Sequence, residues 1–418
     1  MKKFNKVCVI GLGYIGLPTA AVFASRKVKV LGVDINQQAV DTINQGKIHI
    51  VEPELDILVH AVVKDGYLKA ATLPDEADAF IIAVPTPFKG NDHEPNLDYI
   101  KAASKSVAKV LKKGNLVILE STSPVGATEQ MAKWLADERP DLTFPHQIGE
   151  ESDIKIAHCP ERVLPGQVIR ELVENDRIIG GMTQQCTEQA VNLYKIFVQG
   201  ECIKTNTRTA EMAKLTENSF RDVNIAFANE LSILCDKLDI NVWELIKLAN
   251  RHPRVNILQP GCGVGGHCIA VDPWFIVHQN PNEAKMIKTA REINDDKPNF
   301  VIQKVKERVK DISRPKIACL GLAFKPDIDD LRESPALDIV VKLASEYDNQ
   351  ILAVEPNISQ LPQKLQHRTN VKLVSLEQAL EEADVVVILV KHKEFIDIQN
   401  VIVQKKNILN FVANYDAK

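Results

Sequence analysis

The stretch Lys6-Val-Cys-Val-Ile-Gly11-Leu-Gly-Tyr-Ile-Gly16, near the start of the chain, decides the fold class. Residues 6–10 read as a short buried strand, and the glycine-spaced turn after them leads into the helix-forming residues 18–24. In such a GxGxxG turn the first glycine permits a tight bend, the second admits a pyrophosphate against the backbone, and the third lets the helix pack closely on the strand. The strand–turn–helix context therefore predicts a dinucleotide-binding βαβ unit.

An acidic residue at the end of the next strand favours NAD over NADP. Residues 28–33 read as that strand, and Asp34 follows them at close to the offset of about 20 residues expected for an acid that binds ribose hydroxyls. Ile35 and Asn36 come next, so this segment offers no arginine to a 2′-phosphate. We expect NAD to contact Gly11, Gly13, Tyr14, Ile15, Gly16 and Asp34.

Two further apolar runs read as parallel strands of the same sheet. Residues 79–84 lead into Pro85-Thr-Pro87, and residues 115–120 lead into Ser121-Thr-Ser-Pro-Val-Gly126. Ligands of open α/β sheets bind beyond the carboxyl ends of the strands. Residues near the nicotinamide end are therefore expected to be Pro85, Thr86 and Thr122, although the two threonines are also ordinary turn or cap residues.

The last third of the chain repeats the pattern of the first third. Residues 316–320 read as a strand that ends at Gly321, and Ile351-Leu-Ala-Val-Glu355 parallels Val30-Leu-Gly-Val-Asp34. The run 382–388 likewise parallels 76–82. We expect an α/β fold with two Rossmann-like domains of doubly wound, mostly parallel sheets, joined by a long central helix with a helical middle domain.

The second copy of the glycine fingerprint is incomplete. It reads Gly321-Leu-Ala-Phe-Lys325-Pro, so a second dinucleotide is not expected. Lys325 and Arg332 suit a different phosphorylated ligand, such as a nucleotide attached to the substrate, and both are also counted among the residues that border the cofactor. A purely structural second domain is the alternative.

The loop Gly261-Cys-Gly-Val-Gly-Gly-His-Cys268 has four glycines in six residues, which lets its backbone approach a ligand closely. Cys268, at its end, is poorly placed for core packing and well placed to attack a substrate, although a buried structural cysteine is the commoner case. Asp272 follows one turn later. A zinc site of Cys262, His267 and Cys268 is excluded by the spacing, and no metal is expected.

Residues 209–238 change to a helical period and read as one long helix. Its apolar stripe consists of Met212, Leu215, Phe220, Val223, Phe227, Leu231 and Leu234. Lys214, Asn218 and Arg221 lie three or four residues apart, so that an ammonium and an amide can donate together to a developing oxyanion. A solvated charged face is the alternative. The helix is also long enough to pair with a second copy, which predicts a homodimer.

Two other loops carry charged candidates. Glu161 lies just past a strand that begins at residue 155, where a carboxylate can act as a general base or simply be a surface group. Asn250-Arg-His-Pro-Arg254 precedes the Cys268 loop, and its two arginines can bind a phosphate or a carboxylate.

The totals describe an ordinary globular protein. The chain has 418 residues, 45% apolar and 25% charged, with a net charge of −4, so nucleic acid and anionic membranes are not expected as partners. Its eight cysteines do not read as a disulfide framework, and no leader or membrane-spanning run is present, which predicts the reducing cytoplasm. The expected domains are an NAD-binding domain (1–200), a helical dimerisation domain with the Lys/Asn pair and the cysteine loop (201–300), and a domain for the substrate nucleotide (301–418).

Together these motifs resemble the NAD-dependent nucleotide-sugar 6-dehydrogenases, which turn a sugar CH₂OH into a carboxylate. The resemblance spans nearly the whole chain, through residues 11–16, Val84-Pro-Thr-Pro87, 121–126, Pro160-Glu161, Glu211-Met-Ala-Lys214-Leu-Thr-Glu-Asn218, Gly265-Gly-His-Cys268 and Phe324-Lys325. The chain departs from the UDP-glucose branch at Pro165, where that branch typically has a second glutamate. Any role of that glutamate does not carry over.

The resemblance implies two hydride transfers to two NAD per turnover, with Cys268 forming a thiohemiacetal and then a thioester. It implies that Lys214 and Asn218 stabilise the oxyanion, that Glu161 is the base for the hydrolytic water, and that Asp272 and Thr122 organise the proton path. The implied substrate contacts are Glu161, Arg162, Val163, Leu164, Lys214, Asn218, Arg221, His252, Arg254, Gly265 and Lys325.

Two readings of other classes remain as alternatives. An NAD-binding sensor without turnover has no use for the intact set Cys268, Lys214, Asn218 and Glu161. A one-step hydroxyacid dehydrogenase has no use for a nucleophilic thiol. Replacing Cys268 therefore separates the one-step reading from the two-step oxidation, whereas NAD binding without NADH formation from any nucleotide sugar would favour the sensor.

Overall fold

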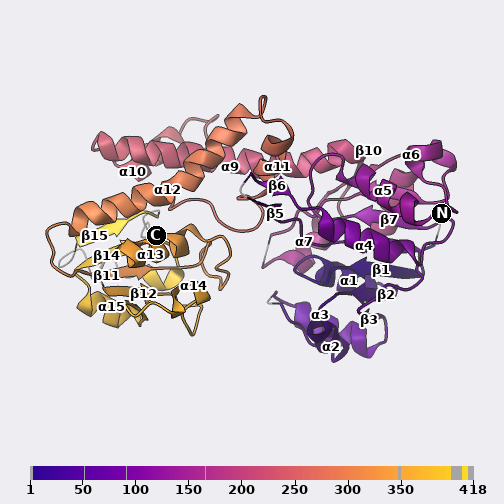
Figure 1. Cartoon of the computed structure of the whole chain (residues 1–418), viewed down its shortest axis with the longest axis horizontal. Helices are drawn as coiled ribbons and strands as arrows, with labels where there is room; N and C mark the ends of the chain where they lie inside the picture. Colours follow the sequence, from indigo (N-terminus) through magenta and orange to yellow (C-terminus); the bar gives the residue numbers. More distant parts are fainter. Residues whose placement is uncertain are drawn as a thin grey trace. The chain divides into compact units, whose positions relative to one another are not determined.

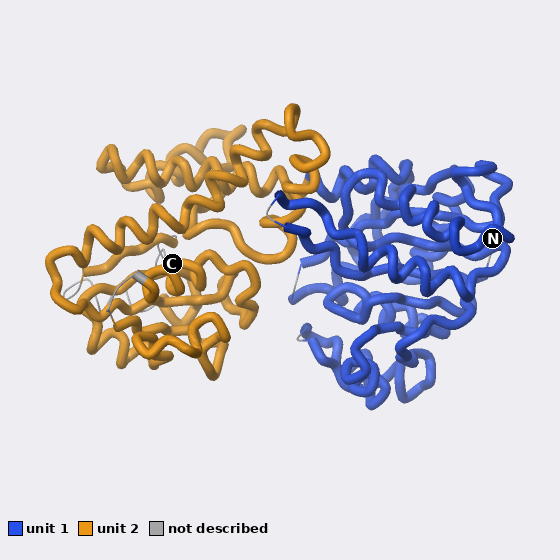
Figure 2. Tube along the Cα trace, viewed as in Figure 1, with its two compact units in different colours: residues 1–216 blue, residues 217–418 orange. Residues whose placement is uncertain are grey.

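The computed structural model describes residues 3–50, 52–90, 92–164, 166–346, 350–396 and 407–412, so that Pro165 lies outside the described residues. The chain divides into two compact units, unit 1 (residues 1–216) and unit 2 (residues 217–418), which Figure 2 colours separately. The boundary falls inside the long helix α9 (Thr207–Lys237), and each unit contains its own large sheet.

Unit 1 has an eight-stranded sheet in the order β10-β9-β8-β7-β4-β1-β2-β3. The strands are β1 (Lys6–Ile10), β2 (Lys29–Val33), β3 (Leu68–Ala71), β4 (Ala79–Ile82), β7 (Leu116–Leu119), β8 (Lys155–His158), β9 (Arg177–Gly181) and β10 (Cys202–Asn206). The six strands from β8 to β3 are parallel, whereas β9 runs antiparallel to β8 and β10 runs parallel to β9. A short antiparallel pair, β5 (Phe88–Lys89) and β6 (Glu94–Pro95), lies outside this sheet.

Helices cover both faces of this sheet (Figure 1) because alternate strand residues point to opposite sides. On one face Val7 and Val9 join a core with α1 (Gly16–Ser25), α3 (Leu55–Lys64), α7 (Val168–Glu174) and α8 (Gln184–Tyr194). On the other face Cys8 and Ile10 pack with α4 (Asp98–Ala108) and α5 (Ala127–Glu138). The remaining elements of the unit are α2 (Gln37–Asn44), α6 (Pro145–Ile148) and the 3₁₀ turn η1 (Gly149–Glu151).

Unit 2 has a five-stranded, fully parallel sheet in the order β13-β12-β11-β14-β15. The strands are β11 (Lys316–Leu320), β12 (Gln350–Val354), β13 (Val371–Leu373), β14 (Val385–Ile388) and β15 (Asn407–Asn410). Ile317 and Cys319 pack toward α12 (Lys285–Val309) and α13 (Pro335–Glu346), while Ala318 and Leu320 pack toward α15 (Leu376–Glu382). The smaller elements are α14 (Gln363–Gln366) and η2 (Lys393–Phe395).

The predicted repeat is present at the level of single hydrogen bonds. The order β13-β12-β11-β14 matches β3-β2-β1-β4. The Gly11 nitrogen donates to the Val33 carbonyl over 2.8 Å, and the Gly321 nitrogen donates to the Val354 carbonyl over the same distance. The predicted fold class, two Rossmann-like sheets with a helical segment between them, is therefore confirmed.

The helical segment begins with α9, whose observed bounds lie within two residues of those expected from the sequence. It continues with α10 (Val242–Ala249), α11 (Asp272–Gln279) and α12. Pro298 lies inside α12, which runs on to Val309, so the boundary expected at residue 300 falls within a helix. None of the helices among the described residues is both long enough and apolar enough to cross a bilayer.

Candidate functional site

The turn after β1 forms a glycine cradle, in which Gly11, Gly13 and Gly16 are required for different reasons. A Cβ on Gly16 would lie 1.8 Å from the Gly11 carbonyl oxygen, and one on Gly11 would lie 2.5 Å from the Ala83 carbonyl oxygen. A Cβ on Gly13 would meet no heavy atom of the described chain within 4 Å. Gly11 and Gly16 are thus fixed by packing, whereas Gly13 leaves its backbone open to a ligand, as a bound pyrophosphate requires.

Asp34, directly after β2, faces this turn. Its carboxylate accepts hydrogen bonds from the backbone nitrogens of Leu12 and Asn36, each over 2.9 Å. Ile35 is 90% exposed and presents an apolar surface beside the carboxylate. The acid is therefore held at the carboxyl end of the strands, where a ribose would lie.

The loops after β4 and β7 are hydrogen-bonded to each other. The Ser121 hydroxyl donates to the Val84 carbonyl over 2.7 Å. The Thr86 hydroxyl is buried and has no hydrogen-bond partner among the described residues, and Thr122 is half-buried. Pro85 is exposed. These positions fit the nicotinamide end of a dinucleotide laid across the cradle.

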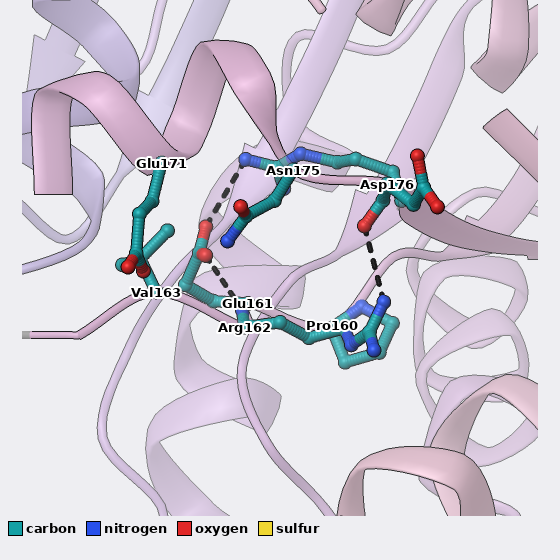
Figure 3. Close-up of a pocket in the computed structure, with 8 residues that line it drawn as sticks. Pro160, Glu161, Arg162, Val163, Glu171, Asn175 and Asp176 are labelled. Atoms are coloured by element: carbon teal, nitrogen blue, oxygen red, sulfur yellow. Dashed lines mark hydrogen bonds and ion pairs between the residues drawn. The ribbon is translucent and has the colours of Figure 1, made fainter. Parts of the chain in front are cut away.

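Glu161 is almost fully buried rather than a surface group. It is 6% exposed, its Oε1 accepts from the Arg162 nitrogen over 2.6 Å, and its Oε2 lies 3.2 Å from the Arg177 guanidinium (Figure 3). A cavity of about 10 Å³, room for one water, is lined by Pro160, Glu161, Arg162, Val163, Glu171, Asn175, Asp176 and Arg177. The sequence did not single out Arg177, whose position at the start of an apolar strand was the available signal.

Lys214 lies on the part of α9 that belongs to unit 1 and is half-buried. One turn earlier, the buried Glu211 accepts hydrogen bonds from the nitrogens of Gly126 and Thr128 over 2.7 and 2.8 Å. It therefore caps α5 and fixes the start of α9 against the loop that carries Thr122. Glu211 begins the motif Glu211-Met-Ala-Lys214-Leu-Thr-Glu-Asn218, and the sequence alone indicated no role for it.

Cys268 is half-buried, whereas six of the eight cysteines, Cys8, Cys159, Cys186, Cys235, Cys262 and Cys319, are buried. Its carbonyl accepts from the nitrogens of Val271 and Asp272 over 3.0 and 2.8 Å, so the residue sits in the tight turn that starts α11. The thiol is thus held at the end of a loop outside the apolar core, as the nucleophile reading requires.

Two glycines of the Cys268 loop are explained by packing within unit 2. A Cβ on Gly265 would lie 2.3 Å from the Glu333 carbonyl oxygen. Gly266 has φ +83°, and a Cβ there would lie 2.9 Å from the Phe324 ring. The loop is therefore seated on the segment that carries the Phe324-Lys325 motif, and its close approach at these two glycines is to protein.

Asn218 and Asp272 are brought together. The Asn218 side-chain amide donates to the Asp272 carboxylate over 2.5 Å, and Asp272 is 3% exposed. Since the Asp272 nitrogen also bonds the Cys268 carbonyl, these three residues form one connected group in unit 2. Glu161, Thr122 and Lys214 belong to unit 1.

The remaining predicted substrate residues lie mostly at the surface. Arg221, His252, Arg254, Leu164 and Lys325 are exposed, Arg162 and Val163 are half-buried, and Gly265 is packed as described. Tyr14 is exposed and Ile15 half-buried beside the glycine cradle. Arg332 is exposed and forms an ion pair with Asp330 over 2.6 Å.

In unit 2 the acid equivalent to Asp34 is fully engaged by protein. Glu355 accepts from the nitrogens of Leu322 and Ala323 over 2.7 and 3.0 Å, and its Oε2 lies 3.0 Å from His392 Nε2. Glu355 is 4% exposed. A second NAD ribose would have to displace this network, which accords with the incomplete fingerprint and with a different ligand for this unit.

Comparison with known proteins identifies the family. Models of the UDP-glucose/GDP-mannose dehydrogenase family match the chain three times: its NAD binding domain at residues 5–198, its central domain at 208–296 and its UDP binding domain at 318–415. The chain therefore belongs to this family of NAD-dependent nucleotide-sugar oxidoreductases.

Individual relatives are similar over nearly the full length. UDP-N-acetyl-D-mannosamine dehydrogenase of Campylobacter jejuni is 84% identical and covers 96% of this chain and 98% of its own. The enzyme of that name from Escherichia coli K12 is 65% identical, with 94% of each chain covered. An NDP-N-acetyl-D-galactosaminuronic acid dehydrogenase of Ralstonia nicotianae is 61% identical, over 99% of this chain and 97% of its own.

Solved structures agree. The UDP-D-ManNAc dehydrogenase from Pyrococcus horikoshii superposes with a TM-score of 0.87 at 40% identity, covering 97% of this chain and 95% of that chain. The native UDP-N-acetyl-mannosamine dehydrogenase from Staphylococcus aureus superposes with a TM-score of 0.86 at 43% identity, covering 99% and 96%.

Proposed function

We propose that the protein oxidises UDP-N-acetyl-D-mannosamine to UDP-N-acetyl-D-mannosaminuronate, consuming two NAD and one water. The observation that carries the choice of sugar is the 84% identity to the Campylobacter jejuni UDP-N-acetyl-D-mannosamine dehydrogenase. The product is an aminouronic acid donor of the kind used for cell-surface polysaccharide. The oxidation is a four-electron change at carbon six, from CH₂OH through an aldehyde to a carboxylate.

The second oxidation at carbon six needs a nucleophile. A hydride leaves from a tetrahedral carbon, and the carbon of a free aldehyde is not tetrahedral. The Cys268 thiolate adds to the aldehyde carbon, and the oxygen takes a proton to give a thiohemiacetal. Loss of hydride from that carbon and of the hydroxyl proton gives a thioester on Cys268. A water then attacks the thioester carbonyl, the C–S bond breaks, and the carboxylate and the free thiol are released.

The surrounding residues have separate roles in this proposal. Lys214 and Asn218, one turn apart on α9, donate to the oxyanion of the tetrahedral species. Glu161 accepts the proton of the hydrolytic water. Asp272 orients the Asn218 amide through their 2.5 Å hydrogen bond, and Thr122 completes the proton path. The base of the first oxidation is left unassigned.

The glycine cradle and Asp34 are the proposed NAD site, with Tyr14, Ile15, Pro85, Thr86 and Thr122 beside it. NAD, when bound, accepts the hydride in each oxidation. The open backbone at Gly13 and the carboxylate held at Asp34 support this assignment, because a pyrophosphate and a ribose diol need these groups. Lys325 and Arg332 are also proposed to contact phosphate groups of the cofactor. Lys325 is proposed to contact the substrate as well.

The proposed domain roles follow the sequence expectation: residues 1–200 for NAD, 201–300 for the catalytic loop and dimerisation, and 301–418 for the UDP group. The proposed substrate contacts are Arg162, Val163, Leu164, Arg221, His252, Arg254 and Gly265 in addition to the catalytic groups. Cytoplasmic location is supported by the free state of all eight cysteines.

A homodimer through α9 is part of the proposal. Phe220, Phe227 and Leu234 recur every seventh position on α9 and are 71%, 52% and 46% exposed. Seven residues are close to two helical turns, so the three side chains share one face. A run of large exposed apolar groups on one helix suits an isologous contact with a second copy.

The test is product mass analysis with NAD and a panel of UDP-ManNAc, UDP-GlcNAc, UDP-GalNAc and UDP-glucose. We expect the uronate from UDP-ManNAc with two NADH formed per product, and kcat/KM at least about tenfold lower for the other sugars. The 61% identical Ralstonia protein makes UDP-GalNAc the informative competitor. Preference for another sugar would overturn the choice of epimer, and NAD binding without NADH formation would favour a sensor.

Cys268→Ser separates the two-step from the one-step reading. We expect this variant to lose acid product, because an alkoxide adduct does not provide the same thioester route. Unchanged acid formation would contradict the role of Cys268. Cys202→Ser, at another half-buried cysteine, is the matched control and is expected to keep full activity.

A further inference from the structure

The proposed base belongs to a buried group of three charged residues in unit 1, Glu161, Arg177 and Glu120. The Arg177 guanidinium lies 3.2 Å from Glu161 and 3.3 Å from Glu120. Arg177, Glu120 and Glu161 are 4%, 1% and 6% exposed. They come from β9, the end of β7 and the loop after β8, so the sheet itself brings them together (Figure 3 shows the Glu161 side).

The guanidinium is held in place by more than its two carboxylates. It stacks over the Tyr194 and Phe197 rings at 5.0 and 5.8 Å, and it lies 3.8 Å from the Cys159 sulfur. A planar cation packed on two rings has little freedom to turn. Its direction toward both carboxylates is therefore fixed by α8 as well as by charge.

One cation cannot offset two buried carboxylates. Glu120 accepts further hydrogen bonds from the Tyr194 hydroxyl over 3.0 Å and from the Thr19 hydroxyl over 3.4 Å. Burial raises the pKa of Glu120 to about 7, against the lowering effect of Arg177, and the Glu161 charge adds to the rise. Cys159 and Tyr194 are neutral near pH 7, because burial raises the pKa of each.

We propose that Arg177 and Glu120 are positioning residues for the proposed base: Arg177 holds the Glu161 carboxylate in place, and Glu120 competes for the same guanidinium. The inference rests on the proposed hydrolytic role of Glu161. When Glu120 is protonated, the whole charge of Arg177 serves Glu161. When Glu120 ionises, that charge is divided between two carboxylates and the guanidinium holds Glu161 less firmly.

The water-sized cavity strengthens this assignment. Its lining includes Glu161, Arg177 and Asn175, whose polar side chains suit a site for a single water. The Arg162 nitrogen occupies the second oxygen of Glu161. Glu161 is thus fixed by a cation and a backbone donor, which a general base needs and a merely structural ion pair does not.

The first experiment measures the pH profile of turnover with UDP-ManNAc and NAD in wild type, Glu120→Gln and Arg177→Lys. For Glu120→Gln we expect the part of the pH dependence of kcat that wild type shows near pH 7 to be lost, because the Arg177 guanidinium then serves Glu161 alone at every pH. For Arg177→Lys, which keeps the charge without the planar fork, we expect kcat to fall at least about tenfold with little change in KM. Arg170→Lys is the control, because Arg170 forms an exposed ion pair with Glu174 in the same unit, and this variant should match wild type.

A second readout follows the covalent intermediate. If Arg177 positions the base for hydrolysis, Arg177→Met should accumulate the acylated chain, seen by intact mass after acid quench, whereas wild type should not. Arg177→Lys should accumulate less than Arg177→Met. A pH profile of Glu120→Gln that matches wild type near pH 7, together with no accumulation, would reduce the cluster to a structural ion pair and overturn the proposal.

A third readout uses no substrate, so that it survives failure of the proposed function. Infrared pH-difference spectra of wild type should show a buried carboxylic acid C=O band that disappears as the pH rises through neutral, and Glu120→Gln should lack it. Persistence of the band in Glu120→Gln would overturn the shared-cation arrangement. If wild type forms no uronate but the band is lost in Glu120→Gln, the proposed function is wrong and the shared-cation arrangement stands.

Discussion

Gly13 and Gly16 belong to the same turn but are required for different reasons. A Cβ on Gly16 would lie 1.8 Å from the Gly11 carbonyl oxygen, whereas one on Gly13 meets open space. We expect Gly13→Ala to fold like wild type and to raise KM for NAD at least about tenfold, because the methyl group occupies the approach to the pyrophosphate. Gly16→Ala should lower the free energy of unfolding by about 1–3 kcal/mol.

Thermal unfolding and NAD kinetics on the two variants separate these effects. Gly114→Ala, whose added Cβ also meets open space but whose φ is +89°, measures the separate cost of a left-handed backbone, which neither Gly13 nor Gly16 has. Equal loss of stability in Gly13→Ala and Gly16→Ala would mean that packing alone accounts for the fingerprint.

Glu120 should make the stability of unit 1 depend on pH. Its folded pKa, about 7, lies above its usual 4.5, so the folded state binds the proton more tightly than the unfolded state. Stability from this group is fully present below pH 4.5 and is lost as the pH rises through 7. The unfolding free energy of wild type minus that of Glu120→Gln should fall by about 3 kcal/mol or less over that window. Urea unfolding from pH 4.5 to 8 measures it, and a difference that grows with pH would be contrary.

Some individual residues were within reach of the sequence and others were not. Asp34 was predictable because its position follows from a local strand and a fixed offset. Arg177 was not, because its two carboxylates are 57 and 16 residues away and meet it only through strand order. Glu355 shows the same limit, since only its tertiary partners reveal that it is unavailable to a ribose.

The joint between α5 and α9 depends on one buried carboxylate. Glu211 accepts from two backbone nitrogens and from the Thr128 hydroxyl over 2.6 Å. We expect Glu211→Ala to cost about 2–3 kcal/mol, because it leaves buried donors without partners. We also expect kcat to fall, since Lys214 lies one turn further along α9.

Glu129→Ala is the matched control for this joint, because Glu129 and Arg208 bridge the same two helices at the surface over 2.7 Å. An exposed pair of this kind is worth about 0–1 kcal/mol. Chemical denaturation and steady-state kinetics compare the variants. An equal loss of unfolding free energy in Glu211→Ala and Glu129→Ala would contradict the role of Glu211 in placing α9.

Secondary structure was predictable where the pattern is local. The bounds of β11 are those expected from the sequence, because it is a short apolar run between clear breaks. The antiparallel β9 and the β5–β6 pair were not expected, since direction and pairing depend on distant partners. The apolar stripe of α9 was read as one set, but Leu215 is buried whereas Phe220 and Phe227 are exposed.

The whole protein is expected to be a dimer whose contact includes the exposed face of α9. In a two-fold contact two Phe227 side chains are buried, one from each copy, and burying a phenylalanine is worth about 1.5–3 kcal/mol. Phe227→Glu places a charge in that contact in both copies, which adds a desolvation cost to the lost burial. We therefore expect this variant to elute as a 46.5 kDa monomer in light-scattering chromatography at micromolar concentration, where wild type has twice that mass.

The control for the dimer is Ile57→Glu, on α3 of unit 1. Ile57 is 71% exposed, more than the 52% of Phe227, so a general loss of solubility or stability would affect both variants alike. Only a contact through α9 predicts that Phe227→Glu dissociates the protein while Ile57→Glu leaves its mass unchanged. Because Lys214 and Asn218 lie on the same helix, turnover of the monomeric variant then measures whether pairing of α9 also holds the proposed catalytic residues in place. If Phe227→Glu keeps the dimer mass, the stripe has another role and the proposed assembly is wrong.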